Sequence, residues 1–91
     1  MNELDQCRRE IDEIDAQLLK LFESRMDVVL NVASYKIKHN LPVLNQNREN
    51  EVLEKIMQQI NNKNYDKYAC EFFIELMRIS KKMQQELIHH G

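Results

Sequence analysis

Apolar residues recur every three or four positions through the first third of the chain, from Leu4 to Val32. This spacing is typical of one face of an amphipathic helix. A break is expected over His39 to Leu44, because Pro42 disfavours helix at the residue before it and has no backbone N–H to donate. The pattern therefore predicts a first helix over residues 3 to 38, whose apolar face is formed by Leu4, Cys7, Ile11, Ile14, Leu18, Leu21, Val28 and Val32.

Two further helices are predicted after the proline. Asn45 and Asn47 are residue types that often cap a helix N-terminus, and an apolar face follows them. This second helix is expected to end in the polar run 61–64, and a third apolar face extends from Tyr65 to Leu87. The sequence thus predicts one all-α domain over residues 1–91, with a long, a short and a medium helix.

The composition supports helices over strands. The only glycine is Gly91 and the only proline is Pro42, so the chain lacks the residues that punctuate hairpins and sandwiches. Cys7 and Cys70 lie far apart and form no metal-ligand cluster, and we expect both to be reduced core residues.

Charge and hydropathy narrow the classes of partner. Lys and Arg number 13 against 15 Asp and Glu, a net charge of −2 that argues against a nucleic-acid-binding surface. No apolar run approaches the roughly 20 residues of a membrane span, and the acidic start is unlike a signal peptide. The expectation is a cytoplasmic protein without membrane or nucleic-acid partners.

The length of the first helix predicts an oligomer. A helix over residues 3 to 38 is about 54 Å long, whereas a compact domain of this size has a radius of gyration near 12 Å. Its apolar face continues through the overhang, so a second copy of the chain is the simplest cover. We expect an intertwined homodimeric helical bundle, with an extended coiled coil as the alternative.

Two cations interrupt the apolar face of the first helix. Arg25 occupies the position where the spacing from Leu18 and Leu21 calls for an apolar residue. Lys36 follows eleven residues later, which is three turns plus about 20°, so both cations project from nearly the same face. Burying such charges is costly unless something pairs with them, so we predict that they flank one ligand.

Polar residues also interrupt the other two faces. Ser80 and Gln84 stack four residues apart on the third helix, and Asn45, Arg48 and Glu49 share one side at the start of the second. Simpler interpretations stay open: Asn45 as a helix cap, Arg48 and Glu49 as solvated charges, and Ser80 with Gln84 as satisfied core residues.

Arg8 is a candidate of a different kind. It lies seventeen residues before Arg25, about 25 Å along the helix, which is too far for both to touch one small molecule. Antiparallel pairing about an axis near Leu18 would bring Arg8 of one chain to the level of Arg25 and Lys36 of the other. Each site would then be shared between two subunits.

These residues together carry a resemblance that covers essentially the whole chain. The segment CRREIDEID at residues 7–15, followed by Leu18, Leu19 and Arg25, resembles the first helix of the all-helical, AroQ-class chorismate mutases. The remaining matches, in order and spacing, are Lys36, the Pro42-Val43 loop, the Arg48-Glu49 pair and the segment SKKMQQ at residues 80–85.

The resemblance implies an isomerase that rearranges chorismate to prephenate in phenylalanine and tyrosine biosynthesis. It also implies the substrate contacts: Arg25, Lys36, Arg48 and the partner's Arg8 hold two carboxylates with help from Ser80, Lys36 and Gln84 donate to the ether oxygen, and Glu49 binds the ring hydroxyl. Asn45 is a departure, because family members commonly carry Asp there. Asn can still accept through its amide oxygen and also cap the helix.

A one-step pericyclic shift transfers no proton to or from the enzyme, so we expect no metal, cofactor or covalent intermediate. His89 and His90 are adjacent and point apart on a helix, which is unlike a metal-ligand pair. Two alternatives remain: an isochorismate-pyruvate lyase, whose substrate also has two carboxylates and an ether oxygen, and a non-catalytic helical module for dimerisation or effector binding.

Overall fold

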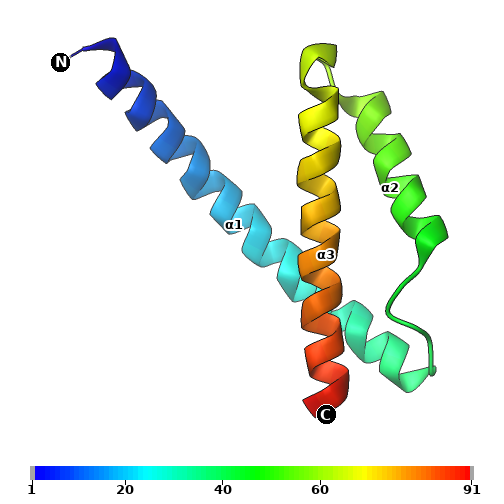
Figure 1. Ribbon diagram of the computed structural model, residues 1–91. Coiled ribbons are helices and arrows are strands. Elements are labelled where there is room, and N and C mark those ends of the chain that lie inside the picture. The colour runs from blue at the N-terminus through cyan, green and yellow to red at the C-terminus, as the bar shows by residue number, and fades with distance from the viewer. Residues whose placement is uncertain (1, 91) are drawn as a thin grey trace.

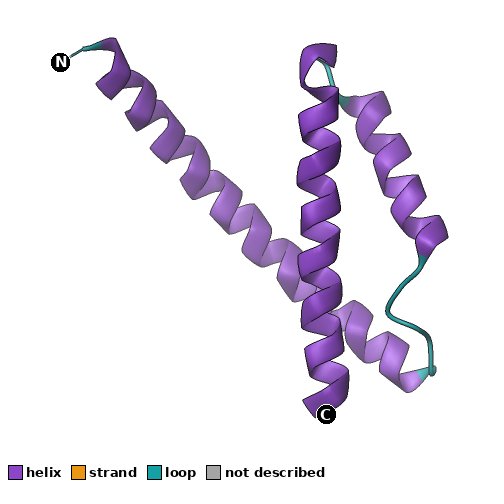
Figure 2. Ribbon diagram, in the orientation of Figure 1, coloured by secondary structure: helices purple, strands orange, loops and turns teal. Residues whose placement is uncertain are grey.

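The chain folds into three α-helices and one short 3₁₀-helix. The computed structural model describes residues 2–90, and side chains through residue 88. Helix α1 spans Glu3–Lys38, α2 spans Gln46–Gln59, the 3₁₀-helix η1 spans Lys63–Tyr65, and α3 spans Asp66–His90. Helices and the loops between them account for all of the described backbone (Figure 2). The predicted all-α fold with a long, a short and a medium helix is confirmed.

Helix α1 has the predicted bounds because its ends carry suitable caps. The Asn2 side chain accepts a hydrogen bond from the backbone N–H of Asp5 at 2.8 Å. The helix ends at Lys38, and Asn40 then adopts a positive φ of 55°, a conformation that Asn tolerates better than most residues. Pro42 follows and prevents the helix from resuming at once.

Asparagine also starts the next two elements. The Asn45 side chain accepts from the backbone N–H of Arg48 at 3.1 Å and caps α2, so the capping role predicted for Asn45 is confirmed. Asn62 does the same for η1 through the backbone N–H of Asn64 at 3.0 Å. The 3₁₀ turn was not predicted; it occupies the polar segment where the second helix was expected to end.

Helix α3 packs against both α1 and α2, whereas the N-terminal half of α1 projects away from the other helices (Figure 1). The chain measures 55 × 27 × 15 Å, with a radius of gyration of 16.5 Å instead of about 12 Å for a compact domain. Among the described side chains, the buried apolar residues are only Ala33 and Met77. A single chain therefore has almost no hydrophobic core of its own.

The small core corrects one expectation. Both cysteines are free, but Cys7 is exposed and Cys70 only half-buried. The prediction that they are core residues is wrong for the single chain, because Cys7 lies on the projecting part of α1. Between residues 2 and 90, no helix combines the length and the apolar composition that a membrane crossing requires.

Candidate active site

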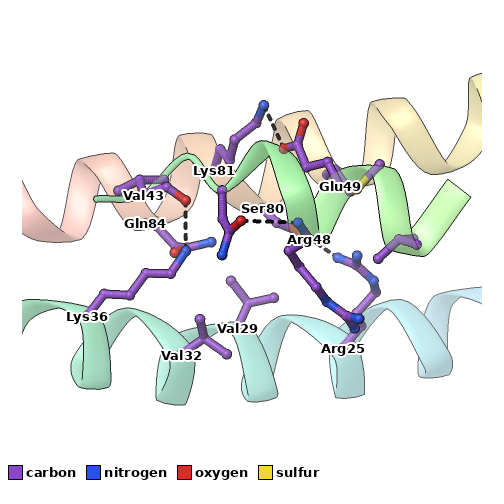
Figure 3. Close-up of a pocket in the computed structure, with 13 residues that line it drawn as sticks. Arg25, Val29, Val32, Lys36, Val43, Arg48, Glu49, Ser80, Lys81 and Gln84 are labelled. Atoms are coloured by element: carbon purple, nitrogen blue, oxygen red, sulfur yellow. Dashed lines mark hydrogen bonds and ion pairs between the residues drawn. The ribbon is translucent and has the colours of Figure 1, made fainter. Parts of the chain in front are cut away.

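A pocket of about 170 Å³ lies where the C-terminal half of α1 meets α2 and α3 (Figure 3). It is open to solvent, and part of its lining is apolar. Its lining comes from all three helices and from the loop between α1 and α2: Arg25, Val29, Val32, Lys36, Val43, Asn45, Arg48, Glu49, Val52, Met77, Ser80, Lys81 and Gln84. Seven of the eight predicted site residues are in this set.

The two cations of α1 are held by neighbours on other segments. Arg25 donates from Nη1 to the hydroxyl of Ser80 on α3 at 2.5 Å, and Lys36 donates from Nζ to the backbone carbonyl of Val43 at 2.7 Å. Both ammonium and guanidinium groups retain further N–H donors, because each carries more than one. The contacts therefore orient the cations toward the pocket while leaving donors for a ligand.

Two polar residues of α3 are the most deeply buried part of the pocket wall. Ser80 and Gln84 are 6% and 5% exposed. Ser80 accepts from Arg25 and donates its hydroxyl hydrogen to the carbonyl of Leu76 at 2.8 Å, so its hydrogen-bonding capacity is largely used within the chain. The amide oxygen of Gln84 is buried without a hydrogen-bond partner among the described residues, so this acceptor is open to a donor group on a ligand.

The residues of α2 differ in how far they are sheltered. The Arg48 side chain is 58% exposed and pairs with Glu51 at 3.4 Å, whereas the Glu49 side chain is only 19% exposed. Glu49 pairs through Oε2 with the ammonium group of Lys81 on α3 at 2.8 Å. The interpretation as a solvated charge thus fits Arg48 better than Glu49.

The balance of charge in the pocket is positive. Arg25, Lys36, Arg48 and Lys81 contribute four cations, and Glu49 contributes one carboxylate. Two of the cations are guanidinium groups, whose planar fork of donors suits carboxylates. The arrangement fits a small molecule with two negative charges and an additional group that can donate to Glu49.

Arg8 is the predicted site residue that the chain does not bring to the pocket. It is exposed on the projecting half of α1, about 25 Å along the helix from Arg25. Within one chain it cannot contact the same small ligand. Its predicted role depends on a second subunit.

Lys81 is the polar pocket residue that sequence analysis missed. It lies one position off the face that carries Ser80 and Gln84, so the helical spacing gave no reason to select it. One signal was present. The sequence places the Glu49 carboxylate on the side of the second helix that faces inward, and a sheltered carboxylate needs a nearby cation. The apolar lining, such as Val29 and Met77, could not be separated from ordinary core residues by its spacing.

No group of three His, Cys, Asp or Glu side chains that could hold a metal ion occurs within the described residues. The side chains of His89 and His90 lie outside the described residues, and the expectation about them stays a prediction.

Comparison with known proteins assigns the class to which this fold and pocket belong. The model of the chorismate mutase type II family matches residues 7–85, which include every pocket residue. The chain therefore belongs to the chorismate mutase type II family, and the resemblance inferred from the sequence is confirmed.

Individual relatives agree with this assignment. The chain is 27% identical over 89 residues to a chorismate mutase of Methanocaldococcus jannaschii, covering 97% of this chain and 90% of that protein. It is 34% identical over 90 residues to a bifunctional chorismate mutase/prephenate dehydratase of Buchnera aphidicola, covering 97% of this chain. A protein of the same name from Aquifex aeolicus is 40% identical over 57 residues, or 63% of this chain.

The alignments cover only part of the bifunctional relatives. The chain spans 23% of the Buchnera protein and 16% of the Aquifex protein. No solved structure gives a significant match to the chain.

Proposed function

We propose that this chain is a chorismate mutase, which rearranges chorismate to prephenate in the biosynthesis of phenylalanine and tyrosine. The observation that carries the proposal is the convergence of Arg25, Lys36, Arg48, Glu49 and Gln84 on one cationic pocket in a chain of this family. The substrate is a dianion with a ring hydroxyl and an ether oxygen, and the pocket offers a complementary group for each.

The cations hold the two carboxylates of the substrate and fix its shape. Arg25 and Arg48 supply guanidinium forks from α1 and α2, and Arg8 of the partner subunit completes the set. Fixing both carboxylates folds the enolpyruvyl side chain over the ring, so that the two carbon atoms that bond are already close. Ser80 supports this geometry by holding the guanidinium of Arg25.

Lys36 and Gln84 stabilise the transition state. As the C–O bond breaks, negative charge grows on the ether oxygen, and an ammonium group and an amide N–H aimed at that oxygen bind it more strongly than in the ground state. A differential stabilisation of about 8 kcal/mol corresponds to about a millionfold acceleration. Because no proton moves to or from the enzyme, the reaction needs no metal, cofactor or covalent intermediate.

The ring hydroxyl lies against Glu49 and Asn45 in this proposal. Glu49 accepts from the hydroxyl through its carboxylate. The amide oxygen of Asn45 caps α2, so its amide nitrogen is the group best placed to donate to the hydroxyl oxygen.

We further propose that the active form is an intertwined homodimer. The single chain exposes 7566 Å², whereas a monomeric protein of 11.0 kDa exposes about 5,600 Å². The excess of about 1,900 Å² is in the range that one subunit of an obligate dimer buries. Part of the exposed surface forms an apolar groove of about 550 Å³ between α1 and α3, lined by residues such as Leu18, Phe22, Phe72 and Leu76.

The test is the loss of chorismate absorbance with purified protein, followed by acid conversion of the product to phenylpyruvate. Fast turnover that resists EDTA and yields prephenate is expected. Conversion of isochorismate with release of pyruvate, in place of chorismate turnover, would assign the lyase reaction instead. A folded protein that turns over neither substrate would overturn an enzymatic function and leave the non-catalytic module.

A further inference from the structure

The ion pair between Lys81 and Glu49 differs from the other ion pairs of the described residues. Its Nζ–Oε2 distance is 2.8 Å, and the two side chains are 29% and 19% exposed. The pairs Arg48–Glu51 and Arg78–Glu75 each lie within one helix, three residues apart, with more than half of each side chain exposed. Lys81 and Glu49 instead join α3 to α2 on the side of the pocket that lies away from α1, and both residues line the pocket (Figure 3).

We propose that Lys81 is a positioning residue that aims the Glu49 carboxylate at the ring hydroxyl of the substrate. This inference rests on the proposed function. Lys81 engages Oε2, and within the part of the chain that the structure describes no hydrogen bond reaches the other carboxylate oxygen, Oε1. A carboxylate has about four acceptor positions, so a carboxylate held on one side by an ammonium group still accepts a hydroxyl on the other.

The charges around the pocket explain why a dedicated partner matters. Among the described residues that line the pocket, Glu49 is the only carboxylate, and Arg25, Lys36 and Arg48 are the cations proposed to bind the substrate. Without Lys81, a sheltered carboxylate gains most by turning toward one of these cations. Glu49 would then leave the ring hydroxyl and compete with a substrate carboxylate for the same donors. Lys81 prevents both effects because its ammonium group already pairs with the Glu49 carboxylate.

A purely structural role for the same ion pair makes a different prediction. A pair that only fastens α2 to α3 contributes to the stability of the fold, and its loss affects substrate binding only through unfolding. A positioning role acts through Glu49, so its loss raises KM in a fully folded dimer and has no further effect once Glu49 no longer carries its charge.

The experiment compares KM and kcat for chorismate in Lys81→Met, Lys81→Arg and the matched control Lys82→Met. Lys82 is a neighbouring exposed lysine outside the pocket lining. Lys81→Met is expected to raise KM about tenfold with kcat within about twofold, the size of one charge-assisted hydrogen bond. Lys81→Arg is expected to retain most of the affinity, and Lys82→Met to match the unsubstituted protein.

The same substitution is then made in a Glu49→Gln background, which removes the pair from its other side and guards against a folding defect in one variant. Lys81→Met should change KM there by less than about twofold, because the two residues act as one unit.

An unchanged KM in Lys81→Met, or an equal rise in both backgrounds, overturns the positioning role. If the unsubstituted protein has no mutase activity, the proposed function fails and the inference fails with it; an active protein with an unchanged Lys81→Met variant overturns the inference alone.

Discussion

The two halves of α1 have opposite surroundings in the single chain. The C-terminal half packs on α3, and its cations Arg25 and Lys36 are already held by Ser80 and Val43. The N-terminal half carries an apolar face with equally regular spacing, yet Ile11, Ile14 and Leu18 are about half exposed there. Apolar residues are exposed in the C-terminal half as well, with Val28 and Tyr35 at 59%. The halves differ in that the C-terminal half contributes a wall to the pocket, whereas the N-terminal half projects away from the other helices (Figure 1).

The comparison shows that one periodic apolar pattern can be covered in two ways, by other helices of the same chain or, as proposed, by a second chain. In the C-terminal half, polar residues replace apolar ones where the helix faces the pocket. In the N-terminal half the face stays apolar except at its edges, as expected of a surface that meets another protein chain. The regular apolar spacing alone does not distinguish these two kinds of burial. The polar residues that interrupt it mark the half of the helix that faces the pocket.

The largest expected effect comes from the pocket half. Lys36→Ala should lower kcat about 10²–10³-fold or more, because it removes the charged donor proposed for the ether oxygen. Lys38→Ala is the matched control, since Lys38 lies in the same last turn of α1 and is exposed. Circular dichroism should be unchanged in both variants. A Lys36→Ala rate near that of the unsubstituted protein would show that the assigned pocket is not the active site.

The next prediction concerns the uncovered half. Leu18→Asp places a charge in the apolar groove between α1 and α3, and it should weaken the dimer at least about 100-fold, because a buried unpaired carboxylate is strongly disfavoured. Sedimentation measures the change in mass, and activity should fall with the fraction of dimer. Lys20→Asp, at a neighbouring exposed position, is the control for the added negative charge alone. Equal dimer affinity in the two variants would place the interface elsewhere.

The smallest effect is expected at Asn45, where a cap and a proposed substrate contact coincide. Asn45→Ala should destabilise the protein by about 1 kcal/mol, because the N–H of Arg48 loses its acceptor. Asn45→Asp keeps the cap and should leave stability nearly unchanged, but it replaces the proposed amide donor to the hydroxyl oxygen with an acceptor. Because the single hydroxyl hydrogen is already donated to Glu49, KM should rise a few-fold. Urea unfolding and KM separate the two roles. Equal stability of Asn45→Ala would argue against the cap.

Much of this molecule follows from local rules that the sequence displays. The bounds of α1 could be predicted because the apolar spacing ends shortly before Pro42, and the start of α2 because Asn45 is a good cap. Seven pocket residues could be predicted because each is polar on a face that is otherwise apolar. These signals need no knowledge of how the helices cross.

The remainder depends on the crossing of the helices. Lys81 is one position off the polar stripe of α3 and reaches the pocket only because α2 places Glu49 beside it. The hydrogen bond from Arg25 to Ser80 likewise depends on the distance between α1 and α3. Cys7 was misjudged because the apolar spacing does not distinguish burial within the chain from burial by another chain.

Subunit mixing tests the central claim most directly, namely that the pocket is a chorismate mutase site completed by Arg8 of a second copy. Arg8→Ala and Lys36→Ala are each expected to be nearly inactive alone. When they are unfolded and refolded together in equal amounts, half of the dimers combine one of each, and each such dimer has one intact site of two. The mixture should regain about a quarter of the activity of the unsubstituted protein. Activity equal to the average of the separate variants would contradict a shared site.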